Sequence, residues 1–163
     1  MELKHVSPRG QARMVSVAGK AVTARSARAE AWVTVGPAIA AELRRTGSVA
    51  KGNVLETARL AGVMAAKRTS ELIPMCHPLA LELVEVEASL EGDRVRIETH
   101  ATCEGKTGVE MEALTAAAVA ALTVYDMVKS AGKGVEIGPV RLLEKAGGKS
   151  GTWRRETETR GDR

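Results

Sequence analysis

Residues 94–130, RVRIETHATCEGKTGVEMEALTAAAVAALTVYDMVKS, decide the fold, because they predict a strand, a turn and a long helix in succession. The first part, Arg94 to Glu104, is predicted as a strand. Gly105-Lys106-Thr107-Gly108 is predicted as the turn that follows it. Glu110 to Ser130 is the strongest helix signal in the chain, since acidic residues begin it and a lysine stands in its last turn, as the helix dipole favours.

The segments on either side of this stretch extend the pattern. Before it, Leu81 to Glu91 is predicted as a strand that forms a hairpin with the next one around the Gly92-Asp93 turn. The apolar phase shifts at Leu83-Val84, which predicts a bulge there. After it, Val135 to Leu143 is predicted as a strand, and Pro139 restricts that strand to an edge or irregular position.

A long strand and two helices are predicted upstream. Between Lys20 and Val35 the small and branched apolar residues stand at odd positions, and this period of two predicts a half-buried strand. A short helix over residues 38–45, a turn over 47–52 and a helix over 53–68 follow. Asn53 and Glu56 have the spacing of a capping box at the start of the second helix.

The order of these elements predicts an α+β fold. Strand, helix pair, strand, strand, helix and strand is the ferredoxin-like, or split βαβ, pattern, with one antiparallel sheet and helices on one face. The chain is divided into an N-terminal loop-rich arm (1–18), a single ferredoxin-like catalytic domain (19–146) and a flexible C-terminal tail (147–163). Because 44% of the residues are hydrophobic, we expect another subunit to cover the bare face of the sheet.

Composition limits the class of protein. The 163 residues suffice for one domain, and with no Phe, one Tyr and two Trp the core must consist of Ala, Val, Leu, Ile and Met. The net charge of +4 favours anionic ligands without diagnosing nucleic acid. Cys76 and Cys103 form no framework pattern, which is typical of reduced thiols in the cytosol. With no apolar signal core and no apolar run near the ~20 residues of a membrane span, we expect a cytoplasmic protein.

Asp126 and Lys129 are the sharpest candidates for chemistry. They lie at i and i+3 on one helix face, which continues back through uncharged residues. A carboxylate and an ammonium at the end of an apolar stripe would be partly dehydrated, so each could shift its pKa and exchange protons near neutral pH. A surface ion pair, stabilising by about 0.3–0.5 kcal/mol, remains the alternative.

Glycine-lysine turns recur along the chain. A glycine lets the backbone approach an anion closely, and a neighbouring ammonium can hold phosphate oxygens. Lys51 is the best placed, just before the helix that starts near Asn53. None of the turns has the spacing of a P-loop, and a solvated loop remains the alternative for each. The turns are Gly19-Lys20, Lys51-Gly52, Gly105-Lys106, Gly132-Lys133 and Gly148-Lys149.

His77 lies in a loop stiffened by prolines on both sides. A rigid imidazole beside basic residues could bind phosphate or pass a proton, and a structural histidine is the alternative. Metal binding is disfavoured, because the adjacent Cys76 and His77 cannot readily converge on one ion and no second ligand pair has usable spacing. We therefore expect no metal site.

Taken together, several long sequence motifs resemble those of the family of molybdenum cofactor biosynthesis protein C, the cyclic pyranopterin monophosphate synthases. The resemblance covers residues 14–151. The motifs on which the resemblance rests are Lys51-Gly52-Asn53-Val54, Ala65-Ala66-Lys67-Arg68-Thr69, Leu72-Ile73-Pro74-Met75-Cys76-His77-Pro78-Leu79, Gly105-Lys106-Thr107-Gly108-Val109-Glu110-Met111-Glu112-Ala113-Leu114, Tyr125-Asp126-Met127 and Ile137-Gly138-Pro139-Val140-Arg141-Leu142.

The resemblance implies a reaction and an assembly. The implied substrate is (8S)-3′,8-cyclo-7,8-dihydroguanosine 5′-triphosphate, which a lyase of this family rearranges to cyclic pyranopterin monophosphate with release of diphosphate. The implied assembly is a homohexamer, a trimer of dimers, with active sites at the dimer interface. No cofactor is required on this view, while Mg²⁺ bound with the triphosphate stays open.

The resemblance also implies roles for single residues. Asp126 and Lys129 would be the catalytic pair. The implied substrate-binding residues are Lys51, Met75, Cys76, His77, Met111 and Glu112, with Arg25, Lys67, Glu110 and Lys145 as further members of the pocket. The chain departs from the family pattern at Ser16 and Asn53, where the family usually or often has Asp, and this puts local loop contacts in doubt.

Two other classes remain as alternatives. A ferredoxin-like RNA-binding module would stack bases on aromatic side chains of its sheet, and only 2% of this chain is aromatic. An inactive structural homologue is the other alternative, against which the intact pair of Asp126 and Lys129 argues. We expect no nucleic-acid partner and no membrane partner.

Overall fold

The computed structural model describes residues 10–156 of the chain. Within this range the predicted order of strands and helices is present. The elements, in chain order, are β1 (Thr23–Thr34), α1 (Pro37–Thr46), β2 (Ser48–Val49), β3 (Gly52–Asn53), α2 (Val54–Ala66), α3 (Thr69–Leu72), β4 (Leu83–Glu91), β5 (Arg94–Gly105), α4 (Glu110–Val128), β6 (Glu136–Ala146) and β7 (Trp153–Arg154).

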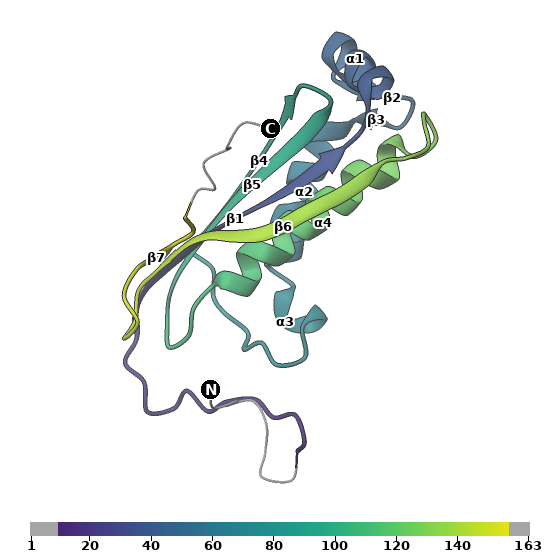
Figure 1. Cartoon of the computed structure of the whole chain (residues 1–163). Helices are drawn as coiled ribbons and strands as arrows, with labels where there is room; N and C mark the ends of the chain where they lie inside the picture. The colour runs from purple at the N-terminus through teal and green to yellow at the C-terminus, as the bar shows by residue number, and fades with distance from the viewer. Residues whose placement is uncertain (1–9, 157–163) are drawn as a thin grey trace.

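The main sheet is antiparallel and five-stranded, in the order β4-β5-β1-β6-β7, and β2 pairs with β3 in a separate small hairpin. Apart from the short β7, this is the ferredoxin-like order, in which the first long strand lies between the third and the fourth. Figure 1 shows α2 and α4 side by side across one face of the sheet, with α1 at one end and α3 near the other. The predicted ferredoxin-like α+β fold is confirmed.

The burial of β1 confirms the predicted alternation of buried and exposed residues, whereas the predicted bulge in β4 is wrong. The odd positions of β1, from Ala27 to Val33, are buried. β4 pairs with β5 without a shift from Leu83 to Glu91. The apolar phase changes at Leu83 because β4 begins there with an exposed side chain. The register shifts lie instead between β1 and β6, one of them opposite Pro139, as expected of an irregular strand.

Small side chains bring α2 and α4 close together. A Cβ added at Gly62 of α2 would lie 3.0 Å from the backbone oxygen of Ala116 in α4, so glycine at this position favours the close approach of the two helices. At the start of α2, the Asn53 side chain accepts a hydrogen bond from the backbone N–H of Glu56 at 3.0 Å. The Asn53 half of the predicted capping box is therefore present, and Asn53 performs the role that Asp would perform there. The Glu56 carboxylate accepts hydrogen bonds from Arg59 instead.

The apolar face of α4 supplies much of the core. Thr99 of β5 donates a buried hydrogen bond to the backbone oxygen of Ala113 at 2.8 Å, which joins the sheet to the helix. By length and composition α4 could also cross a membrane, contrary to the expectation that no run approaches a span. Its buried residues pack on the sheet and on α2, and this packing explains the apolar composition. These residues are Ala113, Ala116, Ala117, Ala120, Ala121, Val124 and Val128.

The open face of the sheet is charged rather than apolar, and its expected cover by another subunit stays a prediction. Glu30 of β1 is only 3% exposed, and its carboxylate accepts hydrogen bonds from Arg96 at 3.0 Å and from Arg141 at 2.8 Å. The Arg94 guanidinium lies 4.2 Å from the ring centre of Trp32. The Glu30 carboxylate is therefore satisfied by two arginines from the neighbouring strands.

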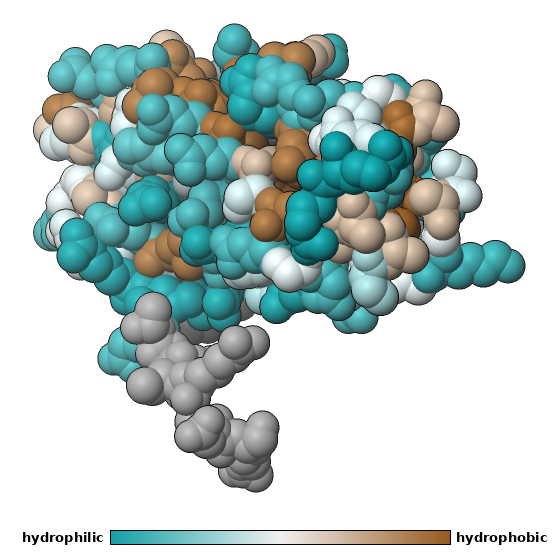
Figure 2. All heavy atoms as spheres, turned by 90° about the horizontal axis from the view of Figure 1, so that it is seen from above, coloured by the Kyte–Doolittle hydropathy of each residue, from teal (hydrophilic) through white to brown (hydrophobic). Residues whose placement is uncertain are grey.

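The exposed apolar side chains lie mainly on the helices. Viewed from the end that carries α1, apolar side chains are interspersed with hydrophilic ones (Figure 2). On α2 and α4 the exposed large apolar residues are Leu60, Met64, Met111, Leu122 and Tyr125. A covering subunit would gain more from this helix layer than from the sheet.

Part of the expected flexible tail has a place in the sheet. Trp153 and Arg154 of β7 pair with Lys145 and Glu144 of β6, and Arg154 forms an ion pair with Glu144 at 3.1 Å. The sequence missed β7 because a two-residue strand has no detectable period. Residues 157–163 of the predicted tail and the first nine residues of the predicted arm lie outside the described residues.

Replacing Glu30 by Gln tests the network on the sheet. We expect the free energy of unfolding to fall by about 1.5–3 kcal/mol, the range for hydrogen bonds to charged groups. Burial alone would raise the pKa of Glu30, but hydrogen bonds from Arg141 and Arg96 outweigh it and hold the pKa below 4.5. The carboxylate thus stabilises the fold at pH values above 4.5. The difference in the free energy of unfolding between wild type and Glu30→Gln should shrink as the pH falls through the pKa of Glu30 in the folded protein.

Urea unfolding at about pH 7 and at about pH 3 measures both effects. The matched control is Glu87→Gln on β4, an exposed carboxylate of the same sheet, for which we expect a change within about 0.5 kcal/mol. Equal losses in the two variants, or a Glu30→Gln deficit that grows in acid, would contradict the role given to Glu30.

Candidate functional site

Asp126 lies between two lysines at the end of α4. Its carboxylate is 2.6 Å from the ammonium of Lys129, one helical turn on, and 2.9 Å from that of Lys51. Lys51 comes from the turn between β2 and β3 and also donates to the backbone oxygen of Asp126 at 2.7 Å. We call these three residues the lysine–aspartate cluster. The structure therefore brings the predicted catalytic pair together with Lys51.

The lysine–aspartate cluster is open to water. The side chains of Asp126 and Lys129 are each 56% exposed, and that of Lys51 is 42% exposed. Hydrogen bonds from Lys129 and then Lys51 lower the pKa of Asp126 to about 2, and the hydrogen bond to Asp126 raises the pKa of Lys129. The expectation of a partly dehydrated pair is wrong for the single chain, because the apolar stripe beside it, with Leu122 58% exposed, is itself uncovered.

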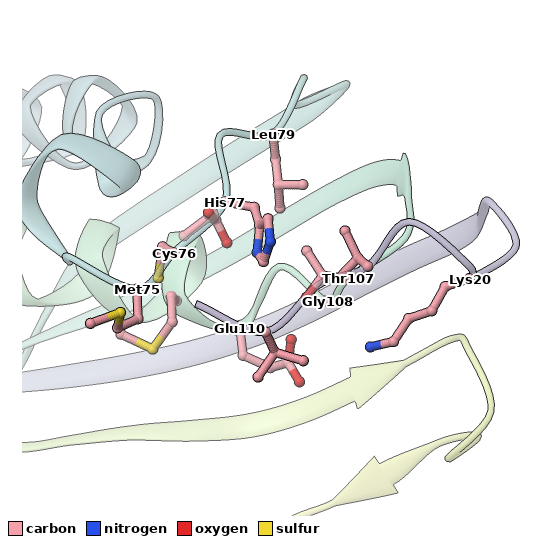
Figure 3. Close-up of a pocket in the computed structure, with 12 residues that line it drawn as sticks. Lys20, Met75, Cys76, His77, Leu79, Thr107, Gly108 and Glu110 are labelled. Carbon is pink, nitrogen blue, oxygen red and sulfur yellow. The ribbon is translucent and has the colours of Figure 1, made fainter. Parts of the chain in front are cut away.

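A hollow of about 400 Å³ lies at the opposite end of α4. We call it the methionine hollow. Its wall is formed by the loop after α3, the start of α4 and the N-terminal segment, and Figure 3 shows the side chains from these segments facing one space. The lining residues are Val15, Val17, Lys20, Met75, Cys76, His77, Leu79, Thr107, Gly108, Glu110, Met111 and Glu112.

Burial sets the acid–base properties of this hollow. Glu112 is buried, and desolvation raises the pKa of its carboxyl above 4.5. Desolvation, and then the negative charge of Glu112, raise the pKa of the Cys76 thiol above 9.0. Glu112 thus has a carboxyl that can accept hydrogen bonds in an apolar setting, whereas Cys76 is a protonated thiol at neutral pH rather than a nucleophile.

A second hollow of about 460 Å³ adjoins the first and shares four lining residues with it. We call it the basic hollow. Lys145 and Glu110 form an ion pair across it at 2.9 Å, and the Arg25 Nε donates to the backbone oxygen of Gly105 at 3.3 Å. Burial would raise the pKa of Glu110, but Lys145 lowers it overall. The lining residues are Lys20, Arg25, Lys106, Thr107, Gly108, Glu110, Lys145, Ala146, Gly147, Lys149 and Ser150.

The structure thus separates the predicted site residues into two groups. Asp126 and Glu110 belong to the same helix, and the 16 residue steps between them correspond to about 24 Å along its axis. Most predicted substrate-binding residues line the two hollows at the start of α4. Lys67, at the end of α2, lines a neighbouring hollow that shares Leu79 with the methionine hollow. Within one chain, the lysine–aspartate cluster is remote from the hollows.

Sequence reasoning missed several lining residues. Lys20, Lys106 and Lys149 line the basic hollow, and their glycine-lysine turns were the signal that could have identified them. Val15 and Val17 bring the expected arm into the wall of the methionine hollow. Among residues 10–156, no group of three or more His, Cys, Asp or Glu side chains could hold a metal ion.

The sheet covered by helices on one face and the two adjoining hollows at the start of α4 define a class, a small ferredoxin-like α+β protein with a cation-lined hollow. A family model described as the MoaC family matches residues 14–148. Since this match spans most of the chain, the chain belongs to the MoaC family, whose role is in molybdenum cofactor biosynthesis.

Thiol labelling tests the electrostatics of the methionine hollow. Cys76 is partly exposed and Cys103 is buried, so we expect iodoacetamide to modify Cys76 first in the folded protein. Because the Cys76 pKa is raised, the rate should still climb as the pH passes 9.0. Glu112→Gln removes a charge that raises this pKa and should speed Cys76 labelling at a given pH.

Mass spectrometry of peptides containing each cysteine measures the two rates. Glu87→Gln, which removes a carboxylate from the sheet rather than from the hollow, is the control. Two outcomes would contradict this account of the hollow. One is a Cys76 labelling rate that stops rising at a pH below the ordinary thiol pKa, and the other is a labelling rate that Glu112→Gln leaves unchanged.

Proposed function

We propose that this chain is a cyclic pyranopterin monophosphate synthase, which converts (8S)-3′,8-cyclo-7,8-dihydroguanosine 5′-triphosphate to cyclic pyranopterin monophosphate and diphosphate. The observation that carries the proposal is the lysine–aspartate cluster in a member of the MoaC family, with the Asp126 carboxylate 2.6 Å and 2.9 Å from two ammonium groups. Such a cluster can give and take protons beside a polyanionic substrate.

The complete site would be formed by two chains. A lysine–aspartate cluster about 24 Å from the hollows cannot act on a substrate bound in them. Met111, Leu122 and Tyr125 leave an exposed apolar stripe along α4, between 37% and 58% exposed. Two copies of α4 packed antiparallel about a two-fold axis would bury this stripe and place the cluster of one chain beside the hollows of its partner. This arrangement agrees with the proposed trimer of dimers.

Burial of the lysine–aspartate cluster by a partner would also shift the pKa values of Asp126 and Lys129 toward neutrality. In the single chain the pKa values of Asp126 and Lys129 are shifted away from neutrality, because the hydrogen bond and the charges of the ion pair favour the charged form of each group. Loss of water disfavours charged forms, so it raises a carboxyl pKa and lowers an ammonium pKa. The pair would then be able to exchange a proton near neutral pH.

The proposed reaction has two stages. First, Asp126 and Lys129 relay protons while the guanine-derived ring opens and recloses as a pterin. Then a ribose-derived hydroxyl passes its proton to the same relay and attacks the innermost phosphorus. The bond to the next phosphate breaks, and diphosphate leaves with the bonding electrons. The cyclic phosphate and the diphosphate account for all three phosphorus atoms, so no external acceptor is needed. Lys51 and other cationic side chains around the phosphates stabilise the departing charge. His77 can donate a hydrogen bond to the innermost phosphate, and Mg²⁺ bound with the triphosphate can add to the stabilisation.

The open face of the sheet argues against the RNA-binding alternative. Its aromatic residue on β1, Trp32, is covered by the Arg94 guanidinium at 4.2 Å. The neighbouring strands contribute glutamates such as Glu87 and Glu98, which repel a phosphate backbone.

Substitution in the lysine–aspartate cluster tests the chemistry. We expect Lys129→Ala and Asp126→Asn to fold normally, since both side chains are more than half exposed. Their turnover of the cyclised nucleotide should fall by about 10²–10⁴-fold, the usual loss when positioned acid–base help is removed. Diphosphate release by the purified protein supplied with the cyclised nucleotide is the measurement.

The matched control is Glu42→Gln, which breaks an i,i+3 ion pair with Arg45 on α1 at 2.8 Å and should leave turnover unchanged. Near wild-type turnover in either cluster variant would remove the catalytic role from that residue.

Mixing two inactive variants tests the composite site. In a heterodimer of Lys129→Ala and His77→Ala chains, one site would carry both defects and the other would be intact. Random exchange of subunits should therefore restore about a quarter of wild-type turnover, if two-fold dimers pair at random. Co-refolding of equal amounts, followed by the diphosphate assay, measures the recovery.

The control is a mixture of Lys129→Ala with Asp126→Asn, in which every site carries a defective cluster and none should recover. Absence of recovery in the first mixture, with both single variants folded and dimeric, would show that one chain holds the whole site.

A further inference from the structure

Three glycine-lysine turns that are far apart in the sequence meet at the basic hollow. Lys20, Lys106 and Lys149 all line it, whereas Lys133 of another such turn does not. The proposed reaction, which relies on Lys51 and His77, gives these three lysines no role. Their convergence is therefore a feature of the structure that needs an explanation.

The basic hollow has more positive charge than its own carboxylate can balance. Five Lys or Arg residues line it with one Glu. That carboxylate, Glu110, is already paired with Lys145 at 2.9 Å. Among the described residues, Lys20 and Lys149 have no acidic partner, and Lys106 donates only to the backbone oxygen of Ala18 at 3.2 Å. An anionic ligand would complete this set of charges.

The backbone of the third turn is shaped to lie against Arg25. Gly148 has a φ of 70°, which favours glycine, and a Cβ added there would overlap the Arg25 guanidinium. A side chain at this position would strain the left-handed backbone and displace the Arg25 guanidinium, so glycine lets the turn lie directly against it. The loop thus holds a backbone and an ammonium beside Arg25, as in sites where a glycine turn approaches a phosphate.

We infer that the basic hollow binds the diphosphate part of the substrate and holds it as it leaves, with Lys20, Lys106 and Lys149 as binding residues beyond Arg25 and Lys145. Its volume of about 460 Å³ lies within the range of small-ligand pockets. This inference rests on the proposed function for the identity of the ligand. It requires only that an inorganic polyphosphate anion binds there.

The inference also orients the substrate. The methionine hollow shares Lys20, Thr107, Gly108 and Glu110 with the basic hollow, so one elongated ligand can occupy both. Beyond the shared residues, the methionine hollow offers sulfur and aliphatic side chains with the buried Glu112 carboxylate, which can accept hydrogen bonds from the N–H groups of a base. The base would lie at the methionine end and the terminal phosphates at the lysine end.

Titration of the full chain with inorganic diphosphate tests the inference without any turnover. Isothermal titration calorimetry at low ionic strength compares wild type with Lys20→Ala, Lys106→Ala, Lys149→Ala and the triple variant. We expect each single change to weaken binding about two- to fivefold, as for exposed charge pairs, and the triple change about 10- to 100-fold. The matched control, Lys133→Ala, removes the same charge from a glycine-lysine turn outside the hollow and should bind as wild type does.

Several results would overturn the inference. Undetectable diphosphate binding by wild type, a triple variant within twofold of wild type, or an equal loss in Lys133→Ala would each do so. If the triple variant unfolds, as judged by circular dichroism, the Lys20→Ala/Lys149→Ala double variant replaces it, with an expected loss of about four- to 25-fold on the same scale.

Turnover of the cyclised nucleotide separates this inference from the proposed function. If the wild-type protein turns over the nucleotide and the triple variant binds diphosphate normally, the inference is wrong and the proposed function is supported. A series in which diphosphate binding falls as expected, with no turnover by wild type, would do the opposite.

Discussion

The alanine face of α4 packs on the inner face of the sheet, and the position of every functional group depends on this contact. Ala113, Ala117 and Ala120 are fully buried, and residues this small let the helix lie close to β1 and β5. Thr99 donates to the backbone oxygen of Ala113, which fixes the helix along the sheet. Rotation of α4 would turn Asp126 and Lys129 at its end toward the core, and sliding would break the hydrogen bond from Thr99. Both ends of α4 are therefore fixed in space.

Since α4 is one continuous helix, it separates the chemistry of the chain into two ends. Glu110 and Met111 at its start belong to the hollows, while Asp126 lies in its last turns with Lys51. Between them the outer face of the helix is apolar and uncovered, with Leu122 58% exposed. Such a face lowers the free energy of the assembly when it is buried. The proposed function makes association and completion of the site a single event.

The sequence predicted what depends on local contacts. The phase of β1, the cap at Asn53 and the extent of α4 follow from neighbours within one or two turns, and the structure confirms them. What it could not predict depends on pairing over long separations. Glu30 is buried because Arg96 and Arg141, 66 and 111 residues away, reach it across the strands. The glycine-lysine turns were visible, but only the folded chain shows which of them share a hollow.

The open ion pair at Asp126 has a consequence for the proposed reaction. Two ammonium groups hold this carboxyl in its charged form, with its pKa at about 2, so the free protein is poorly suited to proton transfer at neutral pH. A triphosphate that approaches the cluster competes for the ammonium of Lys51. Once Lys51 turns to the phosphate, Asp126 loses one of its two cations, and its pKa must rise. In the proposed site the substrate would itself help to bring the acid–base pair into its working range, so that proton transfer begins only when the nucleotide is bound.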